Sequence, residues 1–441
     1  MNPGDTTGRI PKESRIAIIG AGVSGLTAAR TLKKLGYNKI TLFEAKDRIG
    51  GKVHSIEKDG LFYEMGGVFV PEEFETIKGL ASEYGSSLTK KQELKTALVR
   101  NGRQVSNFAY TRSEFGTLGT LKSFLRFQRL LARNGDLSRP GFARTDPSMF
   151  RSFNEFAKKH EMQAVAYSSA PFLTGMGYGY VDSTPAVYHL KLMKRTLRFA
   201  LRMELNSVLG LHLPCTYFFE KGYQNLLEKM SADLDIRLGA KARRIVRRFE
   251  EGKLWIVVSA NHVEQVFDQV IISSPPLATR EFLDMSDQEK EVVSGAKHLF
   301  FHTTLFYGRD LPRDVMLFFP EWARSGHPGA PTCIANFHPT HNIFQGYQLH
   351  DGTVSEEKLE EALRRVVWSV GGTIEQTVLR ETFTYFTHFP EEDLDRLKPY
   401  ERLESLQGKN STFFIGGAVS AESAEDTAQY AQQLIRKHFG N

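Results

Sequence analysis

A glycine-rich turn between an apolar run and a helical pattern constrains this chain more than any other feature. The run Ile16–Ile19 has the length of a buried strand, and Gly20, Gly22 and Gly25 follow it with GxGxxG spacing. The first glycine permits a tight turn, the second lets the backbone approach a pyrophosphate, and the third lets a helix pack on the strand. The sequence therefore predicts a strand–turn–helix unit whose helix N–H groups face the phosphates of a dinucleotide.

An acidic residue at a characteristic distance strengthens this interpretation. A second apolar run, at 40–43, leads directly to Glu44, nineteen residues after Gly25. A carboxylate at this point accepts hydrogen bonds from the hydroxyls of an adenosine ribose. The alternative is a tight turn that binds nothing, which would leave the strand, the helix and the acid together without a role.

Two further glycine pairs indicate which dinucleotide is bound. Gly50–Gly51 lies between Arg48 and Lys52, and Gly66–Gly67 follows soon after. A nicotinamide dinucleotide needs the first loop, whereas FAD lies extended through its protein and needs bare backbone from several segments. Either pair alone could be an ordinary turn. Because both pairs follow Glu44 closely in the sequence, together they favour FAD.

The C-terminal region supplies another element of the same kind. Thr412–Ile415 reads as a buried strand that ends in Gly416 and Gly417, and a helix is expected from about Ala428 to Phe439. Asp426 or Thr427 would form the N-cap of this helix. A helix N-terminus carries a partial positive charge. Aimed at the pyrimidine edge of a flavin, it would stabilise the anionic reduced ring.

These residues resemble the FAD-binding signatures of the flavin amine oxidase and phytoene desaturase superfamily. The resemblance covers residues 15–70, about 215–280 and 405–440. The strings at 14–22, 50–55, 63–66 and 177–180 are most similar to bacterial polyunsaturated fatty acid double-bond isomerases. Lys52 departs from the amine oxidases, which usually carry arginine after the paired glycines.

The resemblance implies an α/β fold with a Rossmann-like FAD-binding domain, built on a parallel sheet, and a discontinuous α+β substrate domain. We expect a disordered leader at 1–14, an FAD-binding domain at 15–85, 215–295 and 391–441, and a substrate domain at 86–214 and 296–390. The expected FAD-binding residues are Gly20, Gly22, Ser24, Gly25, Glu44, Ala45, Arg48, Gly50, Gly51, Lys52, Gly66, Gly67, Ala242, Gly417, Ala418, Asp426 and Thr427.

No nucleophilic triad, metal-ligand cluster or pair of acid–base carboxylates can be recognised in the sequence. A flavin carries the difficult chemistry of hydride transfer itself, so the protein needs to supply position and surroundings. We expect an apolar, aromatic substrate cavity, with a cation at its mouth for a carboxylate. Its expected residues are Lys95, Phe172, Met176, Tyr178, Tyr180, Tyr188 and Tyr385, each of which could instead be an ordinary core or surface residue.

Departures from the amine oxidase pattern favour a different reaction. His302 aligns with the lysine that amine oxidases hydrogen-bond through water to flavin N5, and Ala418 replaces a usual glutamate. The leading hypothesis is an FAD enzyme that removes hydride from a long apolar unsaturated substrate, a fatty acid or polyene, as an isomerase or a desaturase. An amine or amino-acid oxidase and a non-catalytic FAD-binding scaffold are the alternatives.

The net charge of +6 is distributed unevenly. Two segments carry cations at helical spacing: Lys122, Arg126, Arg129 and Arg133, then Lys191, Lys194, Arg195, Arg198 and Arg202. These are either solvated helix faces or a peripheral contact with an anionic membrane. Nothing in the sequence indicates nucleic-acid binding.

Cysteine usage and hydropathy bound the compartment. The two cysteines, Cys215 and Cys333, indicate no disulfide framework, and the sequence contains no signal-peptide pattern or membrane-length apolar run. We therefore expect a cytoplasmic protein, possible membrane contact being peripheral. Neither cysteine lies near the C-terminal flavin block, so we expect the FAD to be non-covalent.

Overall fold

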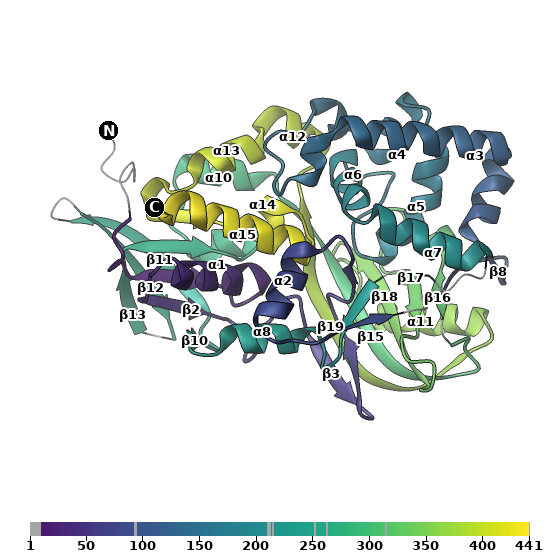
Figure 1. The fold of residues 1–441 in the computed structure, drawn as a ribbon, viewed down its shortest axis with the longest axis horizontal. Coiled ribbons are helices and arrows are strands. Elements are labelled where there is room, and N and C mark those ends of the chain that lie inside the picture. Colours follow the sequence, from purple (N-terminus) through teal and green to yellow (C-terminus); the bar gives the residue numbers. More distant parts are fainter. Residues whose placement is uncertain are drawn as a thin grey trace.

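Two sheets and a layer of helices organise the molecule (Figure 1). The computed structural model describes residues 10–91, 95–209, 213, 216–250, 253–261, 263–313 and 315–440. None of the helices within these ranges has both the length and the apolar character needed to cross a membrane.

The first sheet is parallel and has five strands. Its order is β10 (Asp235–Arg237), β2 (Ile40–Phe43), β1 (Ile16–Ile19), β14 (Gln269–Ile272) and β20 (Thr412–Phe414). All four residues of β1 are buried, as continuous apolar runs are in parallel strands covered on both faces. The GxGxxG turn leads from β1 into helix α1 (Val23–Lys34), which packs beside the C-terminal helix α15 (Ala424–Phe439).

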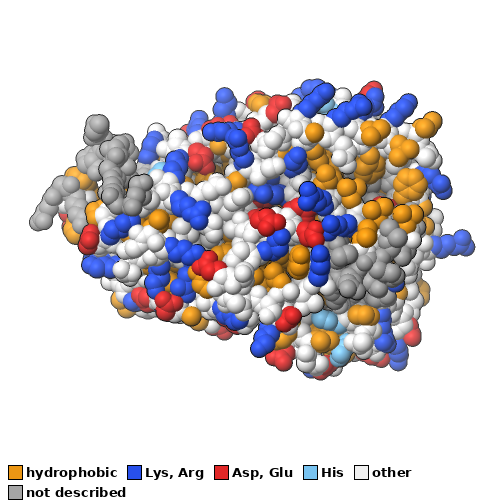
Figure 2. Space-filling view, viewed as in Figure 1, with side chains coloured by type: hydrophobic (Ala, Val, Ile, Leu, Met, Phe, Trp, Pro, Cys, Tyr) orange, Lys and Arg blue, Asp and Glu red, His pale blue; other side chains and the backbone are white. Residues whose placement is uncertain are grey.

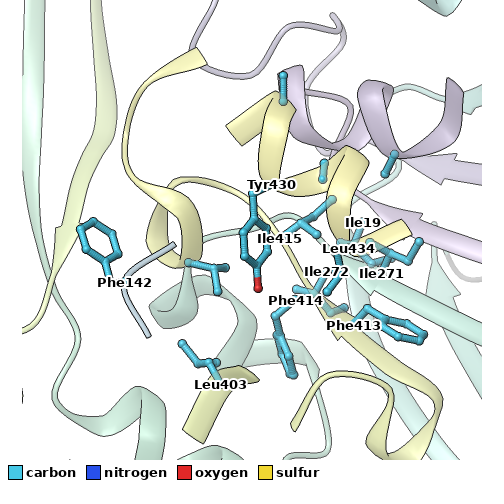
Figure 3. Packing of buried hydrophobic residues seen from close by; sticks show 14 of the residues in the cluster. Ile19, Phe142, Ile271, Ile272, Leu403, Phe413, Phe414, Ile415, Tyr430 and Leu434 are labelled. Carbon is cyan, nitrogen blue, oxygen red and sulfur yellow. The ribbon is translucent and has the colours of Figure 1, made fainter. Parts of the chain in front are cut away.

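The core of this half lies between the parallel sheet and α15. Figure 3 shows Ile19, Ile272 and Phe414 of three adjacent strands close to Leu434 of α15. The ring of Tyr430 packs in the same cluster, and its hydroxyl donates a hydrogen bond to Glu404 Oε1 at 2.5 Å. The first and last elements of the chain therefore share one core.

The second sheet has seven strands and is antiparallel except for one pair. Its order is β19 (Thr373–His388), β15 (Lys297–Arg309), β18 (Ile343–His350), β17 (Pro331–Ala335), β16 (Val315–Phe318), β7 (Lys95–Arg100) and β8 (Arg103–Val105). The parallel pair is β16 with β7.

Three small sheets complete the β-structure. They are the pair β3 (Ser55–Lys58) and β4 (Leu61–Glu64); β5 (Val70–Pro71), β9 (Thr216–Phe219) and β6 (Leu88–Lys91); and β11 (Ala242–Glu250), β12 (Lys253–Ala260) and β13 (Val263–Phe267). The division at residues 85/86 and 214/215 into two domains stays a prediction, and β6 pairs with β9 across it.

A helical layer covers the seven-stranded sheet, and shorter helices flank the parallel sheet. The helices are α2 (Glu75–Glu83), α3 (Asn107–Arg133), α4 (Phe153–Lys159), α5 (Gln163–Gly175), α6 (Ala186–Arg195), α7 (Leu197–Leu209), α8 (Tyr223–Ser231), α9 (Pro276–Phe282), α10 (Asp287–Ser294), α11 (Glu356–Ser369), α12 (Glu391–Leu397), α13 (Pro399–Leu406) and α14 (Gly417–Ser420). Helix α3 bends at Gly116, whose φ of 67° and ψ of 167° interrupt the helical backbone.

Two details differ from the expectations. Helix α15 begins at Ala424 and its N-cap is Ser423, whose Oγ accepts from the backbone N–H of Asp426, so neither Asp426 nor Thr427 is the cap. Residues 1–9 of the expected leader lie outside the described residues. Ile10 is buried and its carbonyl oxygen accepts a hydrogen bond from Tyr37, so residues from 10 onward belong to the folded domain.

Candidate functional site

A cavity of about 450 Å³ lies where the parallel sheet meets the seven-stranded sheet. Glycine turns from both ends of the chain line one part of it. The predicted FAD-binding residues in its wall are Gly20, Gly22, Ser24, Glu44, Ala45, Gly50, Gly51, Lys52, Gly66, Gly67, Ala242, Gly417, Ala418 and Thr427. Segments far apart in the sequence thus converge on one site.

The paired glycines form a cradle that side chains would fill. A Cβ added to Gly51 would lie 3.3 Å from the Cα of Gly22, and one added to Gly66 would lie 1.9 Å from the carbonyl oxygen of Lys52. Gly50 and Gly51 also have positive φ angles, 110° and 60°, which favour glycine. The close packing of these turns leaves bare backbone along the cavity wall, as an extended dinucleotide requires.

The N-terminus of α1 faces this cradle without a side-chain cap. Gly22 is the N-cap residue, no side chain accepts from the first N–H groups of the helix, and its first turn contains no acid. Ser24 and Ser273 lie beside it, with their hydroxyl oxygens 2.7 Å apart. A pyrophosphate would satisfy these donors and the helix dipole, so the described residues fit FAD here.

Glu44 is buried in the wall next to the glycine turn. Its Oε2 accepts from the backbone N–H of Ala21 at 2.8 Å, and its Oε1 accepts from that of Lys46 at 2.9 Å. A carboxylate has about four acceptor positions, so both oxygens retain capacity for ribose hydroxyls. The backbone contacts fix the carboxylate in the position that the sequence predicts for the ribose acid.

Gly25 and Arg48 do not line the cavity, but both shape its wall. A Cβ on Gly25 would lie 2.0 Å from the carbonyl oxygen of Gly20, so the absence of a side chain lets α1 pack on the turn. Arg48 Nη1 donates to the carbonyl oxygens of Ile49 at 3.2 Å and Val53 at 3.1 Å. Arg48 therefore holds the second glycine turn from outside the cavity, and its expected contact with FAD stays a prediction.

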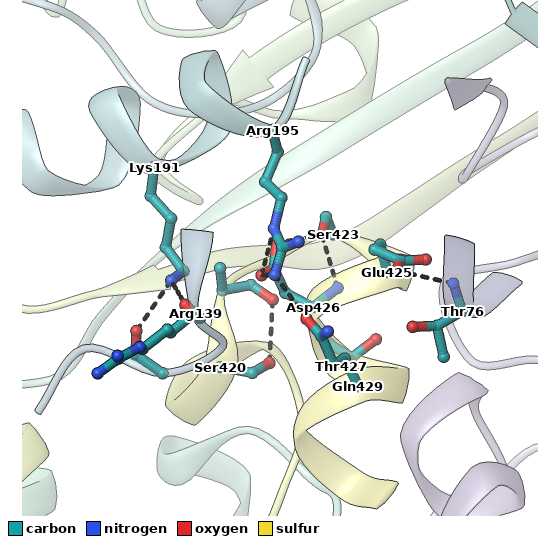
Figure 4. A network of polar contacts seen from close by, with 12 residues as sticks. Thr76, Arg139, Lys191, Arg195, Ser420, Ser423, Glu425, Asp426, Thr427 and Gln429 are labelled. Carbon is teal, nitrogen blue, oxygen red and sulfur yellow. Dashed lines mark hydrogen bonds and ion pairs between the residues drawn. The ribbon is translucent and has the colours of Figure 1, made fainter. Parts of the chain in front are cut away.

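Asp426 is turned away from the cavity and ties α15 to the helical layer. Its Oδ1 accepts from Nη2 of Arg195 on α6 at 3.0 Å, and both side chains are largely buried (Figure 4). The carboxylate of the preceding Glu425 accepts from the backbone N–H groups of Thr76 and Ile77 at the start of α2. The first turn of α15 thus joins α2 and α6 and leaves Thr427 at the cavity.

The far part of the cavity has aromatic and apolar walls. Met176, Tyr178 and Tyr385 line it, as the sequence predicts, together with Phe301 and Tyr347. The ring of Phe301 stacks on Tyr347 with centroids 5.5 Å apart and lies 5.6 Å from the ring of Tyr385. These rings come from three adjacent strands and form the floor of the cavity. Burial raises the pKa of Tyr347 well above its usual value, so its hydroxyl stays protonated.

Four predicted cavity residues lie elsewhere. Tyr180 packs in a neighbouring cluster and its hydroxyl donates to the carbonyl oxygen of Leu349 at 2.9 Å. The hydroxyl of Tyr188 lies 2.8 Å from that of Tyr400, and the ring of Phe172 lies 4.5 Å from that of Phe318. Lys95 is exposed at the start of β7. The two glycines at 177 and 179, with φ of 86° and 80°, turn the chain so that Tyr178 faces the cavity and Tyr180 does not.

His302 does not face the cavity, which corrects its expected place beside the flavin. Its Nδ1 lies 2.7 Å from Thr382 Oγ1, on the other side of β15 from Phe301. Side chains alternate along a strand, so an alignment error of one residue exchanges the two faces. The β15 residue in the cavity wall is therefore Phe301, which has no proton to exchange.

Lys52 and Glu422 form an ion pair in the cavity wall. Lys52 Nζ lies 2.9 Å and 2.7 Å from the two carboxylate oxygens of Glu422. The hydroxyls of Tyr178 and Tyr385 donate to the backbone carbonyl of Glu422 at 3.1 Å and 3.2 Å. The sequence analysis missed Glu422 because no motif marks it. The pair leaves this part of the wall without an uncompensated charge.

Comparisons with known proteins agree with this arrangement. The family model of flavin containing amine oxidoreductases matches residues 23–303. Mitochondrial protoporphyrinogen oxidase of Nicotiana tabacum is 28% identical over 300 residues, which cover 59% of this chain and 58% of that protein. The match thus spans little more than half the length of that relative.

Solved structures extend the likeness to the whole fold. A fatty acid isomerase from P. acnes that produces CLA superposes with a TM-score of 0.85 at 23% identity, covering 98% of this chain and 100% of that one. Putrescine oxidase bound to putrescine superposes with a TM-score of 0.68 at 16% identity, covering 96% and 97%. At these identities the structures show a shared fold. Because the family model spans well over half of the chain and the cavity carries the matching glycine cradle, the protein belongs to the flavin containing amine oxidoreductase family, with FAD as its cofactor.

Proposed function

We propose that this protein moves a double bond along a long apolar unsaturated substrate, a fatty acid or another polyene, without net oxidation. Bound FAD would supply the chemistry by taking up hydride from an allylic carbon and returning it at another carbon of the same molecule. The observation that carries the proposal is the apolar wall beyond the glycine cradle. Phe69, Leu192, Phe199, Met316 and Phe301 line it.

The chain's own residues would position the substrate and exclude water. The stacked rings of Phe301, Tyr347 and Tyr385 offer a flat apolar floor for a chain with several double bonds. Within the described part of the molecule, the buried hydroxyl of Tyr347 has no hydrogen-bond partner. A buried donor without a partner costs free energy, so we expect it to bind a polar group of the substrate.

The Lys52–Glu422 pair argues against a cationic substrate in this cavity. A carboxylate in the wall of a cavity lined by tyrosines is a feature that could hold an ammonium group, and Glu422 is the observation that favours amine oxidation as the second candidate. Lys52 already occupies that carboxylate at 2.7 Å. An amine would therefore have to displace a lysine from its partner, at a cost that an uncharged chain does not incur.

The test is incubation of the FAD-loaded protein with a panel of polyunsaturated fatty acids, carotenoid-like polyenes and amines. The ultraviolet absorbance of new conjugated dienes, oxygen consumption and peroxide are followed together. We expect conjugated dienes from a lipid without oxygen uptake. A substrate deuterated at the abstracted carbon should carry its deuterium to a new position in the product.

Other outcomes would replace the proposal. Stoichiometric peroxide from an amine would make the protein an oxidase, and loss of two hydrogens to an added acceptor would make it a desaturase. Flavin that no lipid or amine reduces would indicate a non-catalytic scaffold.

The variant Tyr347→Phe adds a structural test of the cavity. Loss of one hydrogen bond to the substrate should raise KM about threefold to tenfold. Tyr63→Phe is the matched control, because Tyr63 is also buried with an unpartnered hydroxyl among the described residues but does not line the cavity. Equal KM values for the two variants would remove Tyr347 from the binding site.

A further inference from the structure

Helix α7 has two faces with opposite surroundings. On one face, Phe199 lines the cavity, and Phe199 and Met203 both belong to a buried cluster. On the other face, Leu201, Leu205 and Leu209 follow one another at every fourth residue and are exposed. One helix thus forms a wall of the cavity and presents an apolar stripe to the outside.

Helix α3 carries a second group of exposed leucines. Its residues Leu118, Leu121 and Leu125 are exposed, and α3 packs against α7. The six leucines of both helices, which we call the leucine surface, are between 41% and 73% exposed. Figure 2 shows hydrophobic side chains gathered over this region with lysines and arginines along its upper edge. Grouped exposed apolar side chains with a charged rim indicate an interaction surface.

The two basic segments predicted from the sequence have different fates. Lys122, Arg126, Arg129 and Arg133 are exposed on α3. In the second segment, Lys191 is buried against backbone carbonyls. Lys194 Nζ donates to the carbonyl oxygen of Leu131 at 2.9 Å. Arg195 pairs with Asp426, so these three cations are structural, which corrects the expectation of a second solvated stripe.

The net charge of α3 and α7 nonetheless equals most of the net charge of the chain. The cations are Arg112, Lys122, Arg126, Arg129, Arg133, Arg198 and Arg202, and the acids are Glu114 and Glu204. Seven cations and two acids give +5 on these helices, out of +6 for the whole chain. Arg126 and Arg202 pair with Glu161 and Glu72 of neighbouring segments, so Lys122, Arg129 and Arg133 are the cations of α3 that we assign to a partner. Such a partner must accept leucine side chains and also carry negative charge.

We propose that the leucine surface docks the protein on an anionic lipid bilayer. The leucines would enter the boundary between headgroups and acyl chains, and the cations of α3 would contact the anionic headgroups. Docking stands on the surface itself. The purpose of docking rests on the proposed function. Only α7 lies between the leucines that it exposes and the cavity, so an apolar substrate would pass from the bilayer to Phe199 without crossing water.

The test uses the FAD-loaded protein and vesicles of phosphatidylcholine, with and without phosphatidylglycerol. We expect cosedimentation with the anionic vesicles and release as salt screens the charges. Leu121→Ser with Leu205→Ser should lower the partition coefficient at least tenfold. Leu238→Ser with Val263→Ser is the matched control, since these side chains are as exposed but lie in the other half, Leu238 in the turn after β10 and Val263 on β13.

Charge variants separate the two contributions. Lys122→Gln, Arg129→Gln and Arg133→Gln together should weaken vesicle binding on the order of a hundredfold, at about fivefold for each cation. The matched control removes the exposed cations Lys290, Arg396 and Arg402 of α10, α12 and α13 by the same replacement. FAD content and activity on substrate added without vesicles should be unchanged in all these variants.

Three results would overturn the proposal. Wild-type protein that remains in solution with anionic vesicles excludes docking, as does a leucine variant that binds like the wild type. Light scattering that shows a wild-type dimer, converted to monomer by the leucine variant without vesicle binding, would make this surface a subunit interface. Because docking is measured without turnover, its failure would leave the proposed function intact, and the reverse also holds.

Discussion

Arg48 Nη2 lies 2.6 Å from Glu381 Oε1 and so joins the second glycine turn to strand β19 of the other sheet. Lys46 and His54 also contact this carboxylate. Burial by itself would raise the pKa of Glu381, but hydrogen bonds from His54, Lys46 and Arg48 outweigh it and lower the pKa to about 2. One carboxylate of the seven-stranded sheet therefore holds the turn that forms the cradle.

Glu381→Gln should loosen that turn without changing its shape much. Because Arg48 would lose a charged partner at a largely buried position, we expect the free energy of unfolding to fall by about 1–3 kcal/mol. We also expect the variant to retain less FAD. Thermal unfolding and the ratio of flavin to protein measure the two effects. Glu375→Gln on the same strand, whose pair with Arg309 is exposed, is the control and should change neither.

The lowered pKa of Glu381 also predicts how its contribution to stability changes as the pH falls. A carboxylate whose pKa is lowered on folding contributes stability above its unfolded pKa, near 4.5, and loses it as pH falls toward 2. The difference in stability between wild type and Glu381→Gln should therefore shrink below pH 4.5. A constant difference down to pH 2 would contradict the assignment.

Gly25→Ala should disrupt the cradle through packing alone. Its Cβ would lie 2.0 Å from the carbonyl oxygen of Gly20, so α1 must move away from the turn. We expect a largely FAD-free protein. Gly79→Ala is the matched control, because Gly79 also lies in a helix and its added Cβ would meet no atom within 4 Å. If Gly25→Ala binds FAD like the control, close helix packing is not what the motif provides here.

Heat or acid should release the FAD from the polypeptide. Cys333 is buried in β17 and does not line the cavity, and burial raises the pKa of its thiol well above the usual value. Cys215 lies outside the described residues. After precipitation, the supernatant should contain all of the flavin, measured by absorbance and mass spectrometry. Flavin that stays with the precipitate would show a covalent bond.

Stability should fall from pH 6.5 downward. Burial lowers the pKa of His189, His298, His302 and His388 to about 4, from 6.5 when unfolded. Between pH 6.5 and pH 4 the unfolded chain therefore binds more protons than the native protein. By pH 5 this should lower the free energy of unfolding by about 2 kcal/mol for each histidine.

Thermal unfolding between pH 7.5 and 4.5 measures this dependence. His302→Gln, which can retain a hydrogen bond to Thr382, should lose less stability between pH 7 and 5 than the wild type. His327→Gln, at an exposed position, should behave like the wild type. A flat profile across this range for the wild type would contradict the prediction.

Glu422→Gln should increase the reaction of the reduced protein with oxygen. The change leaves the charge of Lys52 uncompensated in the cavity wall, and a positive charge beside the flavin favours electron transfer to oxygen because the first product is an anion. Peroxide formation after anaerobic reduction and mixing with oxygen measures the rate. Adding Lys52→Met should restore the slow rate. If Glu422→Gln alone leaves the rate unchanged, the ion pair of Lys52 and Glu422 does not control the reaction of the reduced flavin with oxygen.

The cofactor half could be predicted from the sequence because its signals are local. Gly20, Gly22 and Glu44 lie within one strand–turn–helix–strand unit, and their places follow from backbone requirements that short segments express. Arg48 shows the limit of this reasoning. It belongs to the same motif, yet its partner Glu381 is more than three hundred residues away in the sequence.

The substrate half could not be predicted in the same way. Phe301 and His302 differ by one position on β15, and only the pairing with β18 and β19 decides which of them faces the cavity. Tyr178 faces the cavity and Tyr180 does not, because the chain turns at Gly177 and Gly179. Aromatic residues are equally suited to a core and to a cavity wall, so composition identifies the candidates but not their places.

The junction at the first turn of α15 has a consequence for synthesis of the protein. Strand β1 and the first glycine turn leave the ribosome about four hundred residues before Gly417, Ala418 and Thr427, which line the same cavity. Until then α2 lacks the carboxylate of Glu425, and Arg195 lacks Asp426. The nascent chain therefore cannot close its cavity around FAD before residues 417–427 have been synthesised, and cofactor uptake must follow that point.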